Sequence, residues 1–332
     1  MEDCILKINL LVFIALTVFY LYQMIYIVVV LFQKRKEKDR TPAALHRFGV
    51  VIAARNESMV IGNLLRSIKN QTYPAELIDI FVVADNCTDN TAEIAQQEGA
   101  VVYQRVNRQQ VGKGYALDFA FHHIAQGYGS SYHDAFFVFD ADNLLDPHYI
   151  EEMNRVFCQG YPVITSYRNS KNYGTNWITA GYSLWFLREA KYLNNARMIL
   201  GTNCAISGTG FLISSEIVRK YDGWKFHLLT EDIEFSIASA IEGDRIGYCE
   251  KAILYDEQPE TFRQSWTQRL RWSKGFYQVV WNYGGKLLSK LFKDKNHPFC
   301  CYDMFMTIAP ASLLSLACLL MNIIFFLVAI FQ

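Results

Sequence analysis

The sequence lacks any surplus of charge of one sign, since 32 lysines and arginines balance 32 aspartates and glutamates among its 332 residues. This balance gives no indication of a nucleic-acid partner or of a strongly acidic one. The eight cysteines form no CxxC pair, which argues against a disulfide framework and a zinc site and fits a reducing compartment. No internal repeat or low-complexity tract is present.

Complete glycine fingerprints for phosphate binding are also missing. Residues 112–114 have neither the upstream glycine nor the following Ser or Thr of a P-loop, and residues 207–210 have no third glycine of a dinucleotide-binding motif. The sequence therefore supports neither a kinase nor a nicotinamide-dependent oxidoreductase. Lys113 can still offer its cation to a phosphate, because the flanking glycines let the backbone come close to a ligand.

Hydrophobic residues make up 52% of the chain, above the usual range for a soluble domain, and they concentrate at the two ends. Residues 8–32 are almost wholly apolar and long enough to cross a bilayer, and no cleavage site follows them. Five basic residues come directly after: Lys34, Arg35, Lys36, Lys38 and Arg40. We predict a transmembrane helix over 1–33, in preference to a buried core helix, and a basic linker over 34–47 that stays in the cytosol.

A second apolar stretch, residues 304–331, predicts a C-terminal transmembrane segment over 302–332. The chain stops directly after this stretch without a polar or aromatic anchor, so we expect further helices downstream. The two spans bracket a body of about 260 residues, the size of one large α/β domain. We divide it into a domain over 48–261 and interfacial amphipathic helices over 262–298. Three Asn-x-Ser/Thr matches in predicted core elements, at Asn56, Asn70 and Asn86, are interpreted as chance.

Within the body, apolar strands alternate with helices. Strands are predicted over 48–54, 77–84, 101–103 and 135–139, and helices over 59–68, 91–98 and 115–125. Because each strand is apolar throughout, the pattern predicts a mostly parallel sheet covered on both faces. Ligands bind beyond the carboxyl ends of such strands. The polar residues directly after each strand are therefore the first candidates for a functional site.

Two aspartates follow the fourth predicted strand. Alternate residues at a strand end point the same way, so Asp140 and Asp142 can approach one cation. Carboxylate oxygens suit Mg²⁺ or Mn²⁺, which binds substrate phosphates and neutralises a departing diphosphate. The competing interpretation is an Asx-turn in which Asp142 and Asn143 cap a loop. The position after a buried strand favours the metal.

Other acids follow strands or begin helices. Asp85 ends the second predicted strand and Glu57 follows the first, so either can contact a nucleotide, but both also fit helix N-caps. Glu231 and Asp232 precede an apolar helix. Capping with favourable dipole charge explains these two acids well, and the alternative is that one carboxylate is a general base. Local sequence alone favours capping.

The stretch 266–281 combines aromatic and basic residues around Gln268, Arg271 and Trp272. Arginine contacts phosphate through two hydrogen bonds, and tryptophan offers a flat face to a sugar ring or base. An amphipathic helix lying in the membrane interface would explain the aromatic residues. It would not explain Gln268 and Arg271 at this spacing.

Taken in order, these motifs resemble those of the family 2 glycosyltransferases: Asp85, Asp140-x-Asp142, Thr230-Glu231-Asp232 and Gln268-x-x-Arg271-Trp272. They are most similar to the membrane branch that includes cellulose, hyaluronan and poly-N-acetylglucosamine synthases. The resemblance covers about residues 48–275. It implies a GT-A fold and an inverting, single-displacement transfer of a sugar from a UDP-sugar.

The resemblance also implies roles for individual residues. The set expected to bind the nucleotide-sugar is Glu57, Asp85, Lys113, Asp140, Gln268, Arg271 and Trp272. Asp140 and Asp142 would hold the Mg²⁺ or Mn²⁺ cofactor, and Asp232 would be the base that activates the acceptor hydroxyl. The expected acceptor-binding residues are Ser207, Gly208, Thr209 and Glu231, although residues 207–210 differ from the cellulose synthase pattern. One base and one metal suffice for in-line displacement through an oxocarbenium-like state.

Three readings of the whole chain stay open. The first is an integral protein of a bacterial plasma membrane whose cytosolic domain adds sugar to a polysaccharide or another membrane-associated acceptor, with membrane lipids as partners. The second is a non-processive glycolipid synthase, because enzymes resembling ceramide glucosyltransferase share a similar Gln/Arg-x-x-Arg-Trp motif and two spans are few for an export channel. The third, an inactive scaffold of a polysaccharide assembly, is opposed by the presence of every motif residue.

Overall fold

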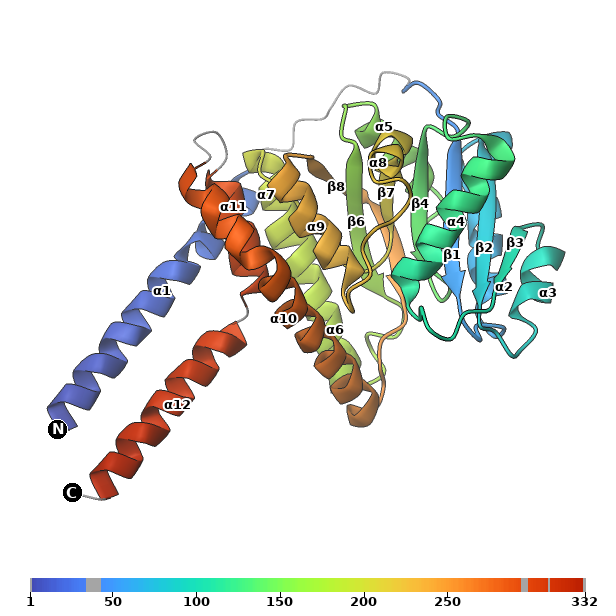
Figure 1. Ribbon diagram of the computed structural model, residues 1–332. Helices are drawn as coiled ribbons and strands as arrows, with labels where there is room; N and C mark the ends of the chain where they lie inside the picture. The colour runs from blue at the N-terminus through green and yellow to red at the C-terminus, as the bar shows by residue number, and fades with distance from the viewer. Residues whose placement is uncertain (1, 34–42, 294–297, 310, 331–332) are drawn as a thin grey trace.

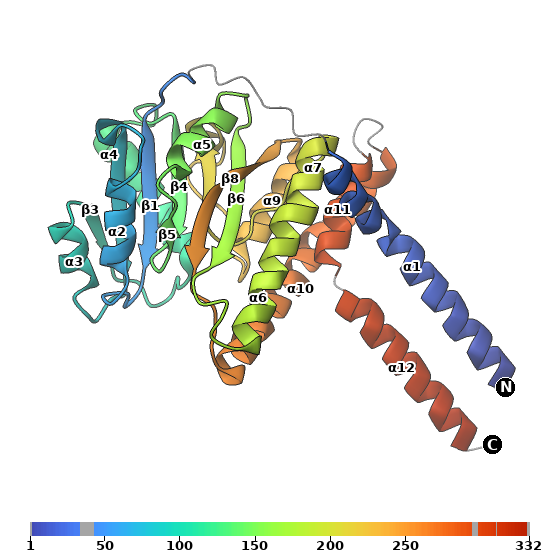
Figure 2. The same cartoon turned by 180° about the vertical axis from the view of Figure 1, so that it is seen from behind.

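The computed structural model describes residues 2–33, 43–293, 298–309 and 311–330. One sheet lies between two layers of helices, and α1 and α12 project together from one side (Figures 1 and 2). The strands are β1 (Phe48–Ala54), β2 (Ile78–Asp85), β3 (Val101–Arg105), β4 (Ala135–Asp140), β5 (Leu144–Leu145), β6 (Val163–Ser170), β7 (Phe211–Ser214) and β8 (Ile246–Asp256). The α-helices are α1 (Glu2–Phe32), α2 (Ile61–Lys69), α3 (Thr91–Gln97), α4 (Lys113–Tyr128), α5 (Tyr149–Phe157), α6 (Trp177–Leu187), α7 (Asn195–Leu200), α8 (Ser215–Lys220), α9 (Glu231–Glu242), α10 (Phe262–Lys293), α11 (Pro298–Ile308) and α12 (Ala311–Ile330).

The strand order is β3-β2-β1-β4-β7-β6-β8-β5. The first four strands of the chain pair in parallel, with α2, α3 and α4 between them, as the alternation of elements predicts. The other half is mixed: β7 is antiparallel to β4 and β6, β6 is parallel to β8, and β5 is antiparallel to β8. Parallel pairings still outnumber antiparallel ones, so the predicted α/β class with a mostly parallel sheet is confirmed.

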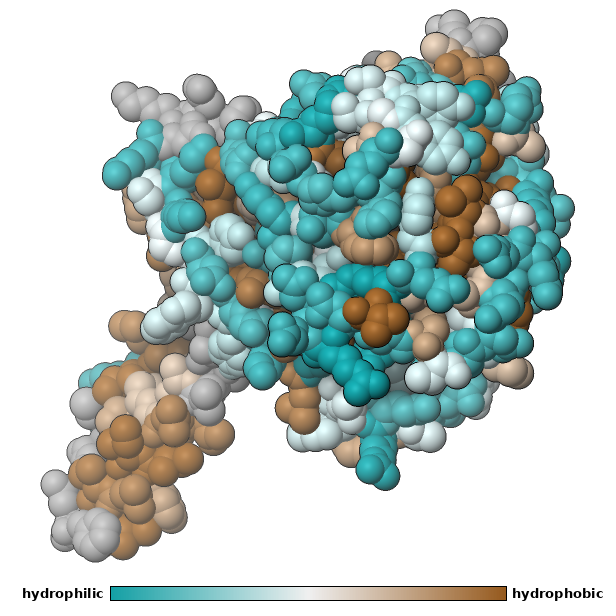
Figure 3. All heavy atoms as spheres, turned by 45° about the vertical axis from the view of Figure 1, so that its right-hand side comes forward, coloured by the Kyte–Doolittle hydropathy of each residue, from teal (hydrophilic) through white to brown (hydrophobic). Residues whose placement is uncertain are grey.

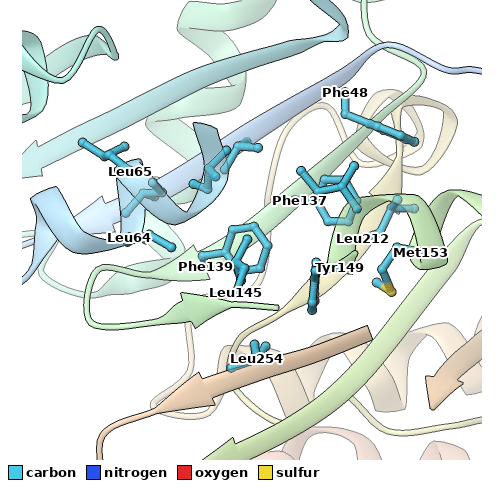
Figure 4. Packing of buried hydrophobic residues seen from close by; sticks show 14 of the residues in the cluster. Phe48, Leu64, Leu65, Phe137, Phe139, Leu145, Tyr149, Met153, Leu212 and Leu254 are labelled. Atoms are coloured by element: carbon cyan, nitrogen blue, oxygen red, sulfur yellow. The ribbon is translucent and has the colours of Figure 1, made fainter. Parts of the chain in front are cut away.

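Alternate residues of β1 enter two hydrophobic cores on opposite faces of the sheet. Phe48, Val50 and Ile52 pack with α2 and α5, whereas Val51 packs with α4 and α9. Figure 4 shows the first core, where aromatic and leucine side chains from early strands, such as Phe48 of β1, meet others from late strands, such as Leu254 of β8. Each fully buried side chain of this kind stabilises the fold by about 1.5–3 kcal/mol. These two cores fix the strand ends from which the site is built.

The N-terminal helix is the part of the chain predicted to span a membrane. Within the described residues, Ile5–Phe32 is the one helix long and apolar enough to cross a bilayer. It is joined to α12 by a hydrogen bond from the Asn9 amide to Asn322 Oδ1, at 3.0 Å. The basic residues expected to orient it, residues 34–40, lie outside the described residues.

Two helices, α11 and α12, occupy the C-terminal stretch 302–332, and the span over it stays a prediction. Met304 and Ile308 belong to α11 and are buried against α9 and α10. A separate helix, α12, follows, and its sequence is almost wholly apolar. The sequence places Pro310 between the two helices, and proline removes a backbone donor that a continuous helix needs.

Candidate active site

A cavity of about 930 Å³ opens at the carboxyl ends of β1, β2 and β4. Every residue predicted for the site lines it except Thr209: Glu57, Asp85, Lys113, Asp140, Asp142, Ser207, Gly208, Glu231, Asp232, Gln268, Arg271 and Trp272. These residues come from sequence positions more than 200 apart and from strands, loops and three helices. The structure therefore brings the motifs into one site.

The end of β2 supplies a carboxylate that is already paired. Asp85 Oδ1 accepts a hydrogen bond from Arg105 Nη1 at 2.7 Å, and both side chains are at most 7% exposed. Asn86 follows with a positive φ of 53° and donates to the same oxygen at 2.9 Å. The sequence pattern did not identify Arg105, which ends β3 two residues beyond the predicted strand. Asp85 therefore reaches the cavity as part of a buried ion pair.

Lys113 begins α4 and connects two walls of the cavity. Its Nζ donates to Asp140 Oδ1 at 2.5 Å and to the Gly208 carbonyl at 2.8 Å. Burial lowers the pKa of Lys113, but the carboxylates of Asp140, Glu231 and Asp232 outweigh it, and the pKa is raised overall. The ammonium group thus stays charged within the cavity.

Asp142 lies near two other carboxylates, those of Asp140 and Asp256. Burial, and then the charges of Asp256 and Asp140, raise the pKa of Asp142 to about 8. Asp256 itself is held by Arg168 and by the amides of Asn143 and Gln258. Asp256 directly ends β8, so the rule that selected the other strand-end acids would have found it. No sequence signal marks Arg168.

Glu57 completes this acidic wall at the end of β1. Burial raises the pKa of Glu57, and the nearby carboxylates of Asp140, Asp89 and Glu257 raise it further. Its backbone N–H donates to Thr91 Oγ1, at the start of α3, at 2.9 Å. The capping interpretation therefore does not describe the Glu57 side chain, which lines the cavity.

Asp140 and Asp142 fit a divalent cation. Among the described residues, no group of three or more His, Cys, Asp or Glu side chains could hold a metal ion by itself. Mg²⁺ and its relatives usually bind through one or two carboxylates plus substrate phosphates, so two aspartates are the expected protein share. The crowding that raises the pKa of Asp142 is the kind that a cation relieves. The residues thus suit a metal that arrives with a diphosphate.

The opposite wall holds two further carboxylates at the start of α9. Gly208 N–H donates to Asp232 Oδ2 at 2.6 Å. Burial raises the pKa of Asp232, although this hydrogen bond and the charges of Lys113 and Arg168 oppose the rise. Burial and the neighbouring Asp232 raise the pKa of Glu231 to about 8. Thr230 makes no side-chain capping bond, but Glu231 and Asp232 lie in the first turn of α9, where their charge favours the helix dipole. The Ile233 N–H also stabilises the Asp232 carboxylate.

The loop before β7 separates the predicted acceptor residues. Ser207 and Gly208 line the cavity, and the Ser207 hydroxyl donates to Glu189 Oε2 at 2.9 Å. Thr209 is buried behind the wall, where it accepts from Asp140 N–H and donates to Asn143 Oδ1. Thr209 therefore supports the loop from Asp140 to Asn143 and does not face the cavity. Glu189 was not predicted, because it lies in a π-helical turn, Arg188–Asn194, that no sequence pattern marks.

Helix α10 brings Gln268, Arg271 and Trp272 over the cavity. Trp272 packs edge-on against Tyr182, with ring centroids 5.8 Å apart. The Gln268 amide oxygen is buried and has no hydrogen-bond partner within the described residues, as expected of a group that awaits a ligand. Helix α10 can lie close to Thr230 because Gly275 has no side chain. A Cβ atom at Gly275 would lie 2.5 Å from Thr230 Cγ2.

The sequence matches a family model described as "Glycosyltransferase like family 2" over residues 46–275. The chain is 28% identical over 283 residues to the probable glycosyltransferase YdaM of Bacillus subtilis, covering 79% of this chain and 61% of that protein. It is 25% identical to a beta-monoglucosyldiacylglycerol synthase of Synechocystis, covering 70% and 48%. It is also 25% identical to a poly-beta-1,6-N-acetyl-D-glucosamine synthase of Staphylococcus aureus, covering 74% and 58%. The chain thus spans about half to three-fifths of the length of these relatives.

Solved structures share the fold at low sequence identity. The mannosyltransferase PcManGT from Pyrobaculum calidifontis, in complex with GDP-Man and Mn²⁺, is 16% identical with a TM-score of 0.62, covering 92% of this chain and 79% of that chain. S. aureus TarS 1–349 with UDP-GlcNAc is 16% identical with a TM-score of 0.55, covering 79% and 71%. The likeness to both is one of fold. Because the family match extends over more than two-thirds of the chain, the protein belongs to glycosyltransferase family 2, and it has a GT-A fold.

Proposed function

We propose that the protein transfers a sugar from a UDP-sugar to a membrane-associated acceptor with inversion at the anomeric carbon, and that Asp232 is the general base. The observation that carries this proposal is the position of Asp232. Its carboxylate is buried and fixed by Gly208 N–H, and it faces the same cavity as Asp140 and Asp142. An acid with a raised pKa can take a proton from a hydroxyl group more readily than an exposed one.

The reaction would proceed in one displacement. Asp232 takes the proton of an acceptor hydroxyl, whose oxygen bonds to the anomeric carbon while the bond from that carbon to the UDP diphosphate breaks. Lys113 and Arg271 balance the charge that the departing diphosphate gains, and Gln268 and Trp272 hold the donor. Asp140 and Asp142 would hold Mg²⁺ or Mn²⁺, which supplies Lewis acidity at the diphosphate when bound. The UDP-GlcNAc held by TarS and the GDP-Man and Mn²⁺ held by PcManGT support a nucleotide-sugar donor with a metal.

A lipid acceptor is the second candidate, and the extent of the cavity favours it. The cavity continues past Asp232 to Tyr20 and Gln23 of α1 and to Met306 and Thr307 of α11. An acceptor anchored in a bilayer around α1 could therefore present its hydroxyl to Asp232 without leaving the membrane. The match to a beta-monoglucosyldiacylglycerol synthase supports this acceptor, whereas the match to a poly-N-acetylglucosamine synthase supports a growing polysaccharide.

We further propose that α1 and α12 embed the protein in a plasma membrane with the catalytic domain in the cytosol. Apolar side chains gather on the projecting helices, while the body in the same view is mostly hydrophilic (Figure 3). Helix α10 exposes Trp266, Trp281 and Phe292, which fits a helix that lies at the membrane interface.

The deciding experiment incubates the purified protein in lipid nanodiscs with a panel of radiolabelled UDP-sugars and Mn²⁺, then sizes the product and tests its extraction into organic solvent. Asp232→Asn should lower the transfer rate by about 10²–10⁴-fold, the usual share of a general base. UDP affinity should stay within about twofold, because Asp232 contacts the acceptor side. Asp79→Asn, at the opposite end of β2, is the matched control and should transfer normally. Turnover retained by Asp232→Asn would remove its role as base.

A further inference from the structure

A buried ionic cluster joins the N-terminal helix to the catalytic domain. Arg197 Nε and Nη2 donate to the two oxygens of Asp303 at 2.7 and 2.9 Å, and Tyr26 of α1 donates to Asp303 Oδ2 at 2.8 Å. Thr307 Oγ1 accepts a further bond from Arg197 at 2.9 Å. The side chains of Arg197 and Asp303 are 3% and 0% exposed. Three separate elements, α1, α7 and α11, thus share one ion pair.

The same cluster reaches the loop that faces Asp232. Arg197 Nη1 donates to Asn194 Oδ1 at 3.2 Å. The Asn194 amide in turn donates to the Ala205 carbonyl at 2.9 Å and accepts from Ala205 N–H at 3.0 Å. This reciprocal pair of bonds fixes the backbone of Ala205 as a strand partner would. Asn194 is the last residue of the π-helical turn, a form of helix found often at functional sites.

Three residues after Ala205, the chain meets the catalytic groups. Gly208 N–H donates to Asp232 Oδ2 at 2.6 Å, and the Gly208 carbonyl accepts from Lys113 at 2.8 Å. The segment 205–208 is therefore anchored at one end by Asn194 and contacts the proposed base and the donor-side lysine at the other. A buried ion pair adds little net stability compared with apolar packing. The Arg197–Asp303 ion pair instead fixes the position of Asn194 relative to α1 and α11.

We propose that Asn194 and Arg197 are positioning residues that, with Asp303 and Tyr26, hold segment 205–208 so that Gly208 keeps Asp232 in place for catalysis. The inference rests on the proposed role of Asp232 as base. On this proposal, α1 anchors the protein and also helps to position the active site through Tyr26. Neither Asn194 nor Arg197 needs to touch the reacting atoms for this role, although both line the far end of the cavity.

The test uses the full chain in nanodiscs and compares Asn194→Ala with Asn154→Ala. Asn154 is equally buried and its amide donates to the Ala44 carbonyl at 2.9 Å, but it lies on α5, away from the cavity. Asn194→Ala should lower kcat by about 10–100-fold, since small displacements of reacting groups cost that much. Its UDP affinity should stay within twofold of the parent. Asn154→Ala should keep kcat while losing a similar amount of thermal stability.

The pH profile provides a readout that a purely structural role would not move. The groups that face Asp232 are Glu231 on α9, Lys113 on α4, Arg168 on β6 and Gly208 N–H. Gly208 N–H stabilises the carboxylate, so loosening this bond raises the pKa of Asp232. The acid limb of kcat should therefore move to higher pH in Asn194→Ala and stay in place in Asn154→Ala.

Tyr26→Phe keeps the proposal testable if Asn194→Ala does not fold. This variant removes one hydroxyl at the distant end of the cluster, and kcat should fall by about 2–5-fold with UDP affinity unchanged. Parent kcat in both Asn194→Ala and Tyr26→Phe would overturn the proposal, as would equal losses in Asn194→Ala and Asn154→Ala. If Asp232→Asn is inactive while these variants are fully active, only the positioning role fails. If Asp232→Asn is active, the proposed function itself fails.

Discussion

The two ends of the cavity hold their charges in different ways. At the donor end, Asp85 is paired with Arg105 and Asp140 with Lys113. At the acceptor end, Glu189 and Asp232 accept hydrogen bonds from a hydroxyl and a backbone N–H, and within the described residues neither forms an ion pair. The pKa values of Glu189 and Asp232 are raised, chiefly by burial.

This difference suits the chemistry expected at each end. A carboxylate beside a cation holds its charge and is a poor proton acceptor, which is useful where a metal and a diphosphate are bound. A buried carboxylate that forms no ion pair has a higher proton affinity, which is useful where a hydroxyl must lose its proton. Ion pairing therefore distinguishes Asp85 and Asp140 from Asp232, whereas burial raises the pKa of Asp142 and Glu57 as well.

The largest expected effect tests whether the donor end depends on pairing. Arg105→Met should lower the free energy of unfolding by about 3–5 kcal/mol, because it leaves the buried Asp85 carboxylate without its partner. Chemical denaturation measures the change. The control is Arg66→Met, which breaks the Arg66–Glu98 ion pair on the surface, where the arginine is 56% exposed, and should cost at most about 1 kcal/mol. Equal losses in the two variants would show that pairing at Asp85 is not special.

The next prediction tests how closely α10 must approach the acceptor end. Gly275→Ala places a methyl group 2.5 Å from Thr230 Cγ2, and overpacking of this kind costs about 1–3 kcal/mol. The Gln268–Trp272 face of α10 should shift and transfer should slow. Gly285→Ala, on the same helix with no atom within 4 Å of the added Cβ, should instead keep full activity. Parent activity in Gly275→Ala would show that the contact is not required.

A smaller effect is expected on UDP affinity when the proposed metal ligand Asp142 is removed. Asp142→Ala should remove most of the gain in UDP affinity that Mn²⁺ gives the parent protein, about tenfold or 1.4 kcal/mol. Isothermal titration calorimetry with and without Mn²⁺ measures it. A parent protein that binds UDP equally well with and without Mn²⁺ would contradict the metal site.

The smallest effect concerns pH. Because burial raises the pKa of Asp232, the base becomes protonated at a higher pH than an exposed aspartate would. The rate of transfer should therefore fall as pH is lowered through this raised pKa, before ordinary aspartates titrate. A pH profile of kcat at saturating UDP-sugar measures the limb. A rate that stays constant down to about pH 4, near the reference value for aspartate, would contradict the effect of burial.

The first half of the sheet is the part that the sequence could predict. The first four strands and three helices were predicted closely, with β1 found at the predicted bounds, 48–54. Each of these strands is an apolar run with a polar residue at its end, and parallel topology places those ends on one edge. Asp85, Asp140 and Asp142 could thus be identified from position alone. The roles proposed for Asp232, Gln268 and Arg271 required the family resemblance.

The remainder depends on tertiary structure that no local pattern encodes. An apolar run such as Phe211–Ser214 indicates burial but not strand direction, so the antiparallel insertion of β7 was not predicted. Arg168 and Glu189 reach the cavity from the middle of a mixed sheet and from a π-helical turn, where spacing gives no signal. Thr209 has the right neighbours in sequence, but its buried hydroxyl bonds to Asn143 and faces away from the cavity.

The hydrogen bond between Tyr26 and Asp303 spans 277 positions of the chain. At a synthesis rate of about 5–20 residues per second, the N-terminal helix would wait roughly 14–55 s for this partner to be made. Contacts so distant in sequence form late, since the entropy of closing the intervening chain must be overcome first. The sheet can therefore fold while α1 is still unattached. Segment 205–208 can thus form beside the sheet first, and it gains the support of α1 only after Asp303 has been made.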